Sequence, residues 1–277
     1  RDLVRSRGLG DVYKRQVIMM KILAAFDSFK ESMTAYAAGE AVQRAYNNVH
    51  ICPLADGGEG TMEVMNRYLH GDIHEIEVAG PLFKTVHAKL AIMDDLAIIE
   101  SAQACGLDYL TEEEKNGTEA TSYGVGEMMK YAYDHGVKRF LLTLGGSACN
   151  DGGIGLLSGM GYGFFDQFDQ RIPMNARGLE TLDHIKKTRL DLSNIEVEGA
   201  CDVTNPLCGK EGATYVFGPQ KKVKDLEKTD QAMKHYAKIM SELVGKDDSC
   251  VSGAGAAGGM GYAIVTCLLY TSPSPRD

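Results

Sequence analysis

Four aspartates each follow an apolar run and adjoin a turn of small residues. They are Asp27, Asp56, Asp151 and Asp202. In α/β proteins, ligands collect where parallel strands end and the chain turns into a helix. Carboxylates repeated at that point predict an acidic site that binds cations. Metal-held phosphates and positioned oxygens supply most of the catalysis in phosphoryl transfer, so the pattern favours that chemistry.

The strongest single segment is the glycine loop at residues 144–153, Leu-Gly-Gly-Ser-Ala-Cys-Asn-Asp-Gly-Gly. An apolar run enters this loop and a helix is expected to leave it, a geometry that binds anions at the helix N-terminus. Asn150 and Asp151 add groups suited to Mg²⁺ or to a substrate hydroxyl. We therefore favour a functional role for this loop over a purely structural one.

A second glycine loop, Asp-Gly-Gly-Glu-Gly-Thr, occupies residues 56–61. Glycine costs about 0.8–1 kcal/mol in a helix interior. It is tolerable where backbone N–H groups must approach a ligand closely. A glycine turn that leads into a capped helix explains this segment equally well.

Two lysines on turns could hold phosphate charge. Lys30 ends Asp-Ser-Phe-Lys at 27–30, where Asp27 could bind a metal or accept a hydroxyl proton. The alternative is an aspartate that caps a turn beside a solvated lysine. Lys221 ends Phe-Gly-Pro-Gln-Lys at 217–221, but it begins a lysine cluster of a kind that is more often solvated surface.

Residues 253–258 fit the pattern G-x-G-x-x-G. A dinucleotide site needs a strand before this motif and an acidic residue about 20 positions later. The preceding residues form a poor strand pattern, so the motif is weak for a dinucleotide and stays open as a phosphate-approach loop. The chain has no G-x-x-x-x-G-K-[ST] motif, which excludes P-loop chemistry. The scattered histidines are interpreted as structural or surface residues.

The two ends of the chain differ in pattern from the middle. Residues 1–16 and 267–277 can be encoded by reverse-complementary DNA, so we interpret both as translated sequencing-adapter tails and leave them out of the fold. The tails carry net positive charge, so the remainder is more acidic than the formal −9 of the whole chain. An acidic surface argues against nucleic acid or an anionic membrane as partner.

The seven cysteines include no Cys-x-x-Cys pair, which disfavours zinc and a redox dithiol. Thiols beside apolar runs are usually buried core residues in a reducing cytosol, so a cytoplasmic location is predicted. No segment has the apolar length of a membrane span, and no secretory signal is visible.

The apolar periodicity predicts strands at 20–26, 49–54, 139–144 and 196–201 and helices at 33–45, 60–69, 122–135, 224–243 and from 253. Thr34 is the expected N-cap of the first helix. A strand, helix and strand at the start imply a parallel sheet. Residues 73–99 alternate like half-exposed antiparallel strands, so a change of domain is expected near Gly71.

Seven segments in chain order together resemble the bacterial type-1 glycerate kinase family. They are residues 21–32, 55–61, 121–127, 144–153, 201–207, 217–221 and 253–259. The resemblance implies that the γ-phosphoryl group of ATP is transferred to D-glycerate with Mg²⁺, usually giving 2-phosphoglycerate, with 3-phosphoglycerate as the other product. It also implies two α/β domains around a cleft, a Rossmann-like parallel sheet and a mixed α/β domain inserted in it.

On this basis we divide the chain into residues 17–71 and 251–266 for the first domain and 72–250 for the inserted domain. Family members continue past residue 259, so the first domain is expected to be incomplete. Two rival interpretations stay open: a nucleotide-dependent oxidoreductase that uses residues 253–258, and a non-catalytic module that binds nucleotide or an organic acid.

The predicted site combines three groups of residues. Catalytic roles are predicted for Asp151, as acceptor of the hydroxyl proton, and for Lys30 and Asp27. Mg²⁺ binding is predicted for Asp56 and Asp202. Substrate or phosphate binding is predicted for Ser28, Gly57, Gly58, Glu59, Gly145, Gly146, Ser147, Asn150, Gly152 and Lys221.

Overall fold

The computed structural model describes residues 21–29 and 32–268. These residues form two compact units, one that ends at Leu54 and one that begins at Ala55. Each unit is built from the mixture of helices and strands that the sequence predicts.

The first unit contains β1 (Ile22–Ala24), α2 (Ala35–Ala45) and β2 (Val49–Ile51). The two strands are parallel, as predicted, with Ile22 opposite Val49. Thr34 is the N-cap of α2, and its hydroxyl oxygen accepts a hydrogen bond of 3.2 Å from the Ala37 amide. The predicted cap is therefore confirmed.

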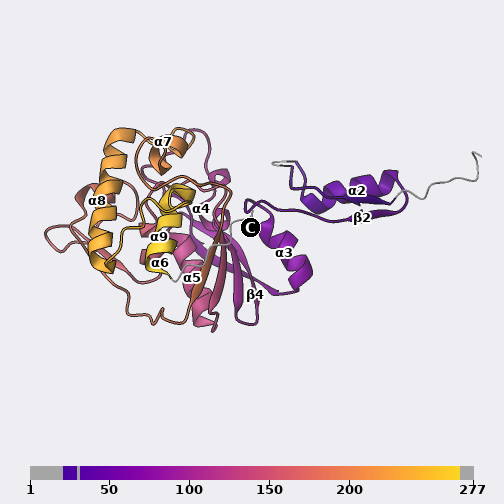
Figure 1. Ribbon diagram of the computed structural model, residues 1–277, viewed down its shortest axis with the longest axis horizontal. Coiled ribbons are helices and arrows are strands. Elements are labelled where there is room, and N and C mark those ends of the chain that lie inside the picture. Colours follow the sequence, from indigo (N-terminus) through magenta and orange to yellow (C-terminus); the bar gives the residue numbers. More distant parts are fainter. Residues whose placement is uncertain (1–20, 30–31, 269–277) are drawn as a thin grey trace, which may run out of the picture. The chain divides into compact units, whose positions relative to one another are not determined.

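A five-stranded sheet organises the second unit (Figure 1). Its strands are β3 (Asp72–Ala79), β4 (Thr85–Met93), β5 (Leu96–Glu100), β6 (Arg139–Thr143) and β9 (Glu196–Ala200), in that order across the sheet. The first three strands are antiparallel, as predicted for residues 73–99, and β5, β6 and β9 are parallel. The sheet is therefore mixed, and three of its strands end at the same edge.

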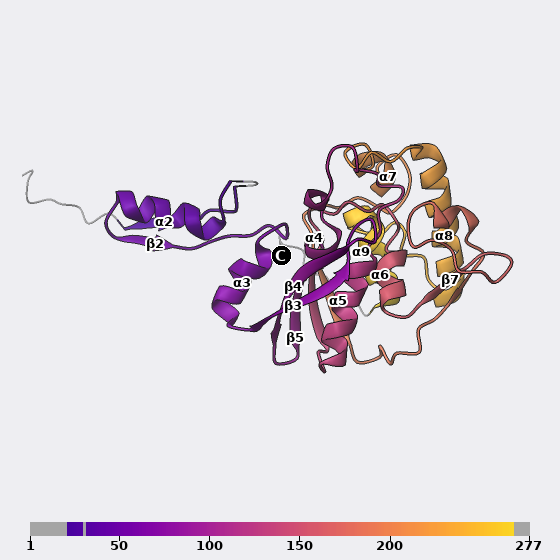
Figure 2. The ribbon, with the colours of Figure 1, turned by 180° about the vertical axis from the view of Figure 1, so that it is seen from behind.

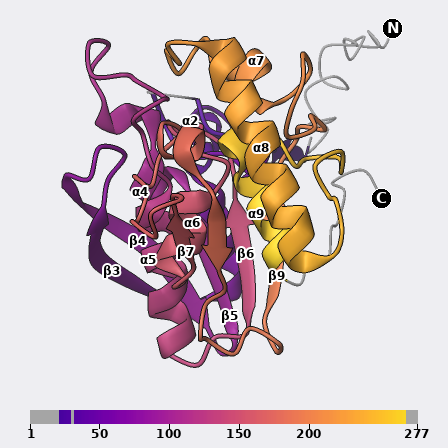
Figure 3. The same cartoon turned by 90° about the vertical axis from the view of Figure 1, so that its left-hand side faces the viewer.

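Helices cover both faces of this sheet. Leu90 and Ile99 face a large core with side chains of α4 (Ala102–Cys105), α5 (Tyr123–Asp134), α6 (Ile154–Gly159) and α9 (Met260–Cys267). Figure 3 shows α5, α6 and α9 in front of the strands. Ala91 and Ile98, which alternate to the opposite face, pack with Met62 of α3 (Thr61–Leu69). Figure 2 shows α3 beside β4 on this other side.

The longest helix, α8 (Leu226–Val244), begins after the cap Asp225 and ends at Gly245 in the left-handed conformation. Its buried stripe includes Met233, Tyr236 and Met240. The sequence predicts this helix, but it does not predict several short elements. These are α4, η1 (Leu107–Tyr109), β7 (Gly163–Phe165), η2 (Gly178–Thr181), β8 (His184–Lys186) and α7 (Ala213–Phe217). The helix predicted from residue 253 begins as η3 (Ala256–Gly259) and continues as α9.

The domain division proposed from the sequence stays a prediction. In the structure, α9 packs against α6, α8 and β9 within the second unit. Cys105 and Cys149 are buried as expected, whereas Cys250 is exposed. Among residues 21–29 and 32–268, no helix has the length and apolar character needed to cross a bilayer.

Candidate active site at the ends of the parallel strands

The three parallel strands of the second unit, β5, β6 and β9, have their carboxyl ends at the same edge of the sheet. Just past the strand ends, the Ser101 amide donates to the Thr143 carbonyl at 3.0 Å. The Leu144 amide donates to the Ala200 carbonyl at 3.1 Å. These bonds hold the segments that follow β5, β6 and β9 side by side, at the position where α/β proteins bind ligands.

The two predicted glycine loops meet at this edge. A Cβ atom on Gly57 would lie 3.0 Å from the Ala200 carbonyl oxygen, and one on Gly145 would lie 2.7 Å from the Gly58 Cα. The Gly145 amide donates to the Gly57 carbonyl at 3.4 Å. Glycine is therefore required at 57, which has φ +91° and lies against the end of β9, and at 145, where the two loops touch through their backbones. Gly146, at φ +73°, stays exposed.

Three predicted carboxylates are exposed on the loops of this edge: Asp56, Glu59 and Asp202. Asp56 Oδ1 accepts from the Gly58 amide at 2.8 Å, which fixes the turn that carries it. Asp202 follows the end of β9 by two residues. Within the described part of the chain, no three Asp, Glu, His or Cys side chains are close enough together to form a metal site on their own.

Glu100 is a carboxylate at this edge that the sequence analysis misses. It is the last residue of β5 and is 2% exposed. Its Oε1 accepts from the Met62 amide in the first turn of α3 at 2.7 Å. Burial raises the pKa of Glu100, the nearby Glu59 charge raises it further, and the donated hydrogen bonds oppose the shift. The sequence pattern that could have identified Glu100 is an acidic residue directly after the apolar residues of β5.

The second half of the 144–153 loop turns into the protein. Asp151 is fully buried, and its Oδ2 accepts from the Ser122 amide and the Ser122 hydroxyl, both at 2.8 Å. The Gly153 amide donates to Oδ1 at 3.0 Å and the Gly155 amide to Oδ2 at 3.3 Å. The first turn of α6 is therefore neutralised by a carboxylate of its own chain rather than left open to a ligand.

This environment bears on the predicted role of Asp151 as base. Burial raises its pKa, and the four donated hydrogen bonds oppose that shift. Because Asp151 is fully buried, a substrate hydroxyl could reach this carboxylate only if the residues that cover it moved. The role of Asp151 as base stays a prediction, while its contacts are those of an internal anchor.

Gly152 and the G-x-G-x-x-G segment at residues 253–258 pack inside the protein rather than facing a ligand. The Gly152 amide donates to the Gly258 carbonyl at 2.9 Å. A Cβ atom on Gly258 would lie 2.2 Å from the Cys149 carbonyl oxygen. The structure thus brings Gly152 against Gly258 and not to the loop edge, because the two glycine segments pack backbone to backbone.

Lys221 is 3% exposed, so the alternative that it is a solvated surface lysine is wrong, and its predicted role in phosphate binding stays a prediction. Its ammonium donates to the Ser147 hydroxyl at 3.0 Å and to the Cys149 carbonyl at 2.7 Å. Burial lowers the pKa of Lys221. Asn150, also buried, donates through Nδ2 to the Thr214 hydroxyl at 3.0 Å. Lys221 therefore supports the 144–153 loop from inside.

The remaining predicted residues belong to the first unit. Asp27 is half-buried, and its Oδ1 accepts from the Ser28 amide at 2.6 Å. Lys30 lies outside the described residues. The structure therefore brings together Asp56 to Glu59 with Gly145 and Gly146 at one edge, and it places Ser147, Asn150, Asp151, Gly152 and Lys221 beneath them or in the packing of the loop.

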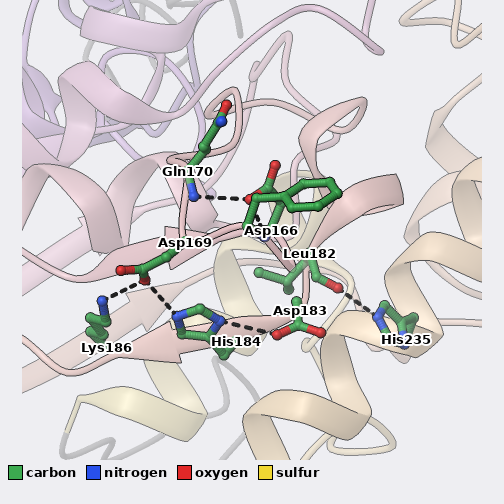
Figure 4. Close-up of polar contacts among 9 residues, drawn as sticks. Asp166, Asp169, Gln170, Leu182, Asp183, His184, Lys186 and His235 are labelled. Atoms are coloured by element: carbon green, nitrogen blue, oxygen red, sulfur yellow. Dashed lines mark hydrogen bonds and ion pairs between the residues drawn. The ribbon is translucent and has the colours of Figure 1, made fainter.

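The histidines fit the structural or surface interpretation where they are described in detail. His184 on β8 lies between two carboxylates, with Nε2 3.1 Å from Asp169 Oδ1 and Nδ1 3.1 Å from Asp183 Oδ2 (Figure 4). His235 on α8 contacts the Leu182 carbonyl at 2.8 Å. These residues tie a peripheral hairpin to its neighbours and to α8.

Comparison with known proteins agrees with this geometry. The sequence profile of the Glycerate kinase family matches residues 22–272. The chain belongs to the glycerate kinase family. The resemblance read from the seven sequence segments is therefore confirmed, and the chemistry of the family is that of a kinase, a phosphotransferase.

Individual relatives cover most of this chain. A glycerate kinase of Haemophilus influenzae is 41% identical over 89% of this chain and 68% of its own length. A glycerate 2-kinase of Escherichia coli is 37% identical over 90% of this chain and 68% of its own length. The crystal structure of a protein described as glycerate kinase 2 from Salmonella typhimurium LT2 is 39% identical, with a TM-score of 0.81, and the match covers 92% of this chain and 71% of that one.

Proposed function

We propose that this chain transfers the γ-phosphoryl group of ATP to D-glycerate and that the product is 2-phosphoglycerate. Membership of the glycerate kinase family supports the acceptor and the reaction class. The observation that carries the chemistry is the meeting of the 56–60 and 144–146 loops at the carboxyl ends of β5, β6 and β9. Phosphoryl transfer depends on positioned backbone donors and charge at such an edge.

The residues at this edge fit Mg²⁺ as the partner of ATP. Their donors are carboxylate oxygens, which Mg²⁺ prefers, and Mg²⁺ usually takes one or two protein carboxylates together with phosphate oxygens and water. We assign Asp56 and Asp202 to Mg²⁺, which when bound would neutralise charge on the phosphates.

The chain's own groups divide into outer and inner roles. We propose that the Gly146 amide faces the phosphates, with Glu59 at the same rim, while Gly57, Gly58 and Gly145 shape the edge through the contacts of their own backbones. Ser147, Asn150, Gly152 and Lys221 then act by holding the loop that presents Gly146. Four internal donors hold Asp151, so this carboxylate is an internal anchor as well as the predicted base. Asp27 and Lys30 keep their predicted catalytic roles, and Ser28 keeps its predicted role in binding substrate or phosphate.

The same proposal implies which molecules the protein binds and where in the cell it acts. A glycerate kinase acts on a small organic acid, so the proposed partners are ATP and D-glycerate, and the proposed location is the cytoplasm, which supplies both. The rival oxidoreductase loses its binding motif, because Gly258 packs against the backbone of Cys149 and Asn150 and Gly255 packs against the backbone of Asn205 and Pro206. A chain that binds ATP or glycerate without forming ADP would instead support the non-catalytic alternative.

The test is ³¹P NMR of this chain with MgATP and D-glycerate, with the Haemophilus relative as positive control. A phosphomonoester resonance coupled to the C2 proton establishes the proposed product. Coupling to the C3 protons moves the product to 3-phosphoglycerate. Unchanged ATP in a sample shown by circular dichroism to be folded contradicts the proposal.

A further inference from the structure

The first turn of α3 has no capping side chain of its own. The residue before it, Gly60, has φ +89° and provides no side-chain hydrogen bond to the helix. The first N–H groups of a helix need partners from outside the helical ladder. Here the Met62 amide finds its partner 38 residues further along the chain, in Glu100.

Glu100 holds the loop as well as the helix. Hydrogen bonding to the Gln103 side chain and to the Gly60 amide also lowers the pKa of this carboxyl. Gly60 and Met62 flank the point where the 56–60 loop becomes α3. The Thr61 hydroxyl closes the same turn by donating to the Gly58 carbonyl at 2.8 Å. One buried carboxylate therefore ties the end of this loop to the end of β5.

The other end of the loop is fixed by close backbone contacts. Gly57 meets Ala200 at the end of β9, and Gly58 meets Gly145 just after β6. Glu100 supplies the third fixed point, after β5. Three strand ends thus define the position of Asp56 and of the Gly58 amide.

A purely stabilising role does not require a carboxylate here. Burying a charge costs free energy unless it is paired and hydrogen-bonded. The nearby Glu59 charge adds to that cost. A demand on the geometry of the loop explains why a carboxylate stands at this position.

We propose that Glu100 is a positioning residue of the kinase site, which sets the place of the 56–60 loop through its hydrogen bonds to the first turn of α3. The proposal deepens the proposed function and rests on it for its kinetic part. Glu100 acts through the loop and is not itself assigned a contact with substrate or metal.

Three variants separate positioning from stability and from proton transfer. Glu100→Ala removes every acceptor at this point. Glu100→Gln keeps an oxygen that can accept from the Met62 amide. Asn66→Ala is the matched control at the opposite end of α3, where Asn66 Oδ1 accepts from the Gly71 amide at 2.8 Å and Nδ2 donates to the Gly71 carbonyl at 3.1 Å.

We expect Glu100→Ala to lower kcat/KM for MgATP by up to about 100-fold, as misplacement of a reacting group by about 1 Å can do. Glu100→Gln should recover most of this loss. Asn66→Ala should lower Tm without a comparable loss of kcat/KM. Hydrogen exchange followed by mass spectrometry should show faster exchange at Met62 in Glu100→Ala and near-normal exchange in Glu100→Gln.

Two results overturn the proposal. The first is equal kcat/KM in Glu100→Ala and Asn66→Ala at equal loss of Tm, which leaves Glu100 a stabilising role only. The second is Glu100→Gln as inactive as Glu100→Ala with wild-type exchange at Met62, which assigns Glu100 to proton transfer. If the wild-type chain forms no phosphoglycerate, the proposed function fails, whereas the exchange comparison still tests how Glu100 holds α3.

Discussion

Ser122 and Asp151 join the first turns of two helices through a single carboxylate oxygen. The amide and the hydroxyl of Ser122, at the start of α5, both donate to Asp151 Oδ2 at 2.8 Å. The Ser122 hydroxyl oxygen in turn accepts from the Leu156 amide of α6 at 2.9 Å. The aspartate that the sequence marks most strongly for catalysis is therefore the residue that fixes α5 against α6.

Asp151→Asn should destabilise the protein. An asparagine can keep its oxygen where Oδ2 accepts three donors, but its NH₂ group then faces the Gly153 amide, which loses its acceptor. An unsatisfied buried donor costs about 1–3 kcal/mol. We expect that drop in the free energy of unfolding, measured by urea denaturation.

Ser122→Ala is the companion variant, because it removes the hydroxyl contacts without touching the carboxylate. An anchor predicts that it, too, lowers stability. If Asp151→Asn unfolds like wild type while kcat falls about 10²–10⁴-fold, the role of Asp151 as base is supported instead.

The sequence locates the loops of the site but not the direction of their side chains. Asp56 and Asp151 both stand before two glycines, yet one is exposed and the other fully buried. The difference comes from Ser122 on α5 and from α8, which cover Asp151 and Gly152 and are distant in sequence.

Local patterns succeed where the cause is local. Thr34 caps the helix that follows it, and the alternation at 73–99 gives antiparallel strands. The role of Glu100 could not be predicted because its hydrogen-bond partner Met62 is 38 residues away, and no local pattern around Glu100 indicates that contact. The burial of Lys221 could not be predicted because a cluster of lysines is typical of solvated surface. The fold instead buries Lys221, the first lysine of the cluster, beneath Ser147.

The stability contributed by Glu100 should fall as pH rises. Its pKa is raised in the folded state, chiefly by burial, so the folded protein binds this proton more tightly than the unfolded chain does. The contribution is complete below the unfolded pKa of about 4.3 and is lost as pH rises through the folded value. We expect the unfolding free energy of wild type, relative to Glu100→Gln, to decrease over this interval in urea titrations. A difference that stays constant from pH 4.5 to 8 would contradict the shift.

Lys221→Met should lower activity without lowering stability. The lowered pKa of Lys221 means that burial of its charge costs more than its polar neighbours return. Replacement of a buried charge by an apolar side chain of similar volume is often neutral or stabilising. The 144–153 loop nevertheless loses the donor to Ser147 and Cys149, so we expect kcat/KM to fall at least about tenfold, or about 1.4 kcal/mol.

The measurement for Lys221→Met is steady-state kinetics beside urea denaturation. Ser147→Ala keeps the bond to the Cys149 carbonyl and should have the smaller effect. Wild-type kinetics in Lys221→Met would show that the ammonium has no role in presenting the loop.

Gly258→Ala should be more damaging than Gly245→Ala. Both glycines have positive φ, at +69° and +83°, so both substitutions carry about 1–2 kcal/mol of backbone strain. A Cβ atom at 258 would also lie 2.2 Å from the Cys149 carbonyl oxygen, whereas one at 245 meets nothing within 4 Å. Overpacking adds about 1–3 kcal/mol, so unfolding free energies should separate the two variants by that amount. Equal losses would show that residues 149–150 give way to the added methyl group.

Asp202→Asn and Asp56→Asn should each raise the Mg²⁺ concentration needed for half-maximal kinase activity. Both carboxylates are exposed at the rim of the site, and loss of even an indirect partner of a metal typically costs about 10–100-fold in affinity. In Mg²⁺ titrations at fixed ATP, we expect the half-maximal Mg²⁺ concentration to rise by at least about tenfold.

Asp191→Asn is the matched control for these two variants. Asp191 is exposed and its Oδ1 accepts from the Ser193 amide at 3.1 Å, as Asp56 Oδ1 accepts from the Gly58 amide, but it lies outside the proposed site. It should leave the Mg²⁺ dependence unchanged. If Asp202→Asn behaves like Asp191→Asn while Asp56→Asn shifts the curve, the metal is held from the 56–60 loop alone, and the loop position set by Glu100 becomes the main control on Mg²⁺ binding.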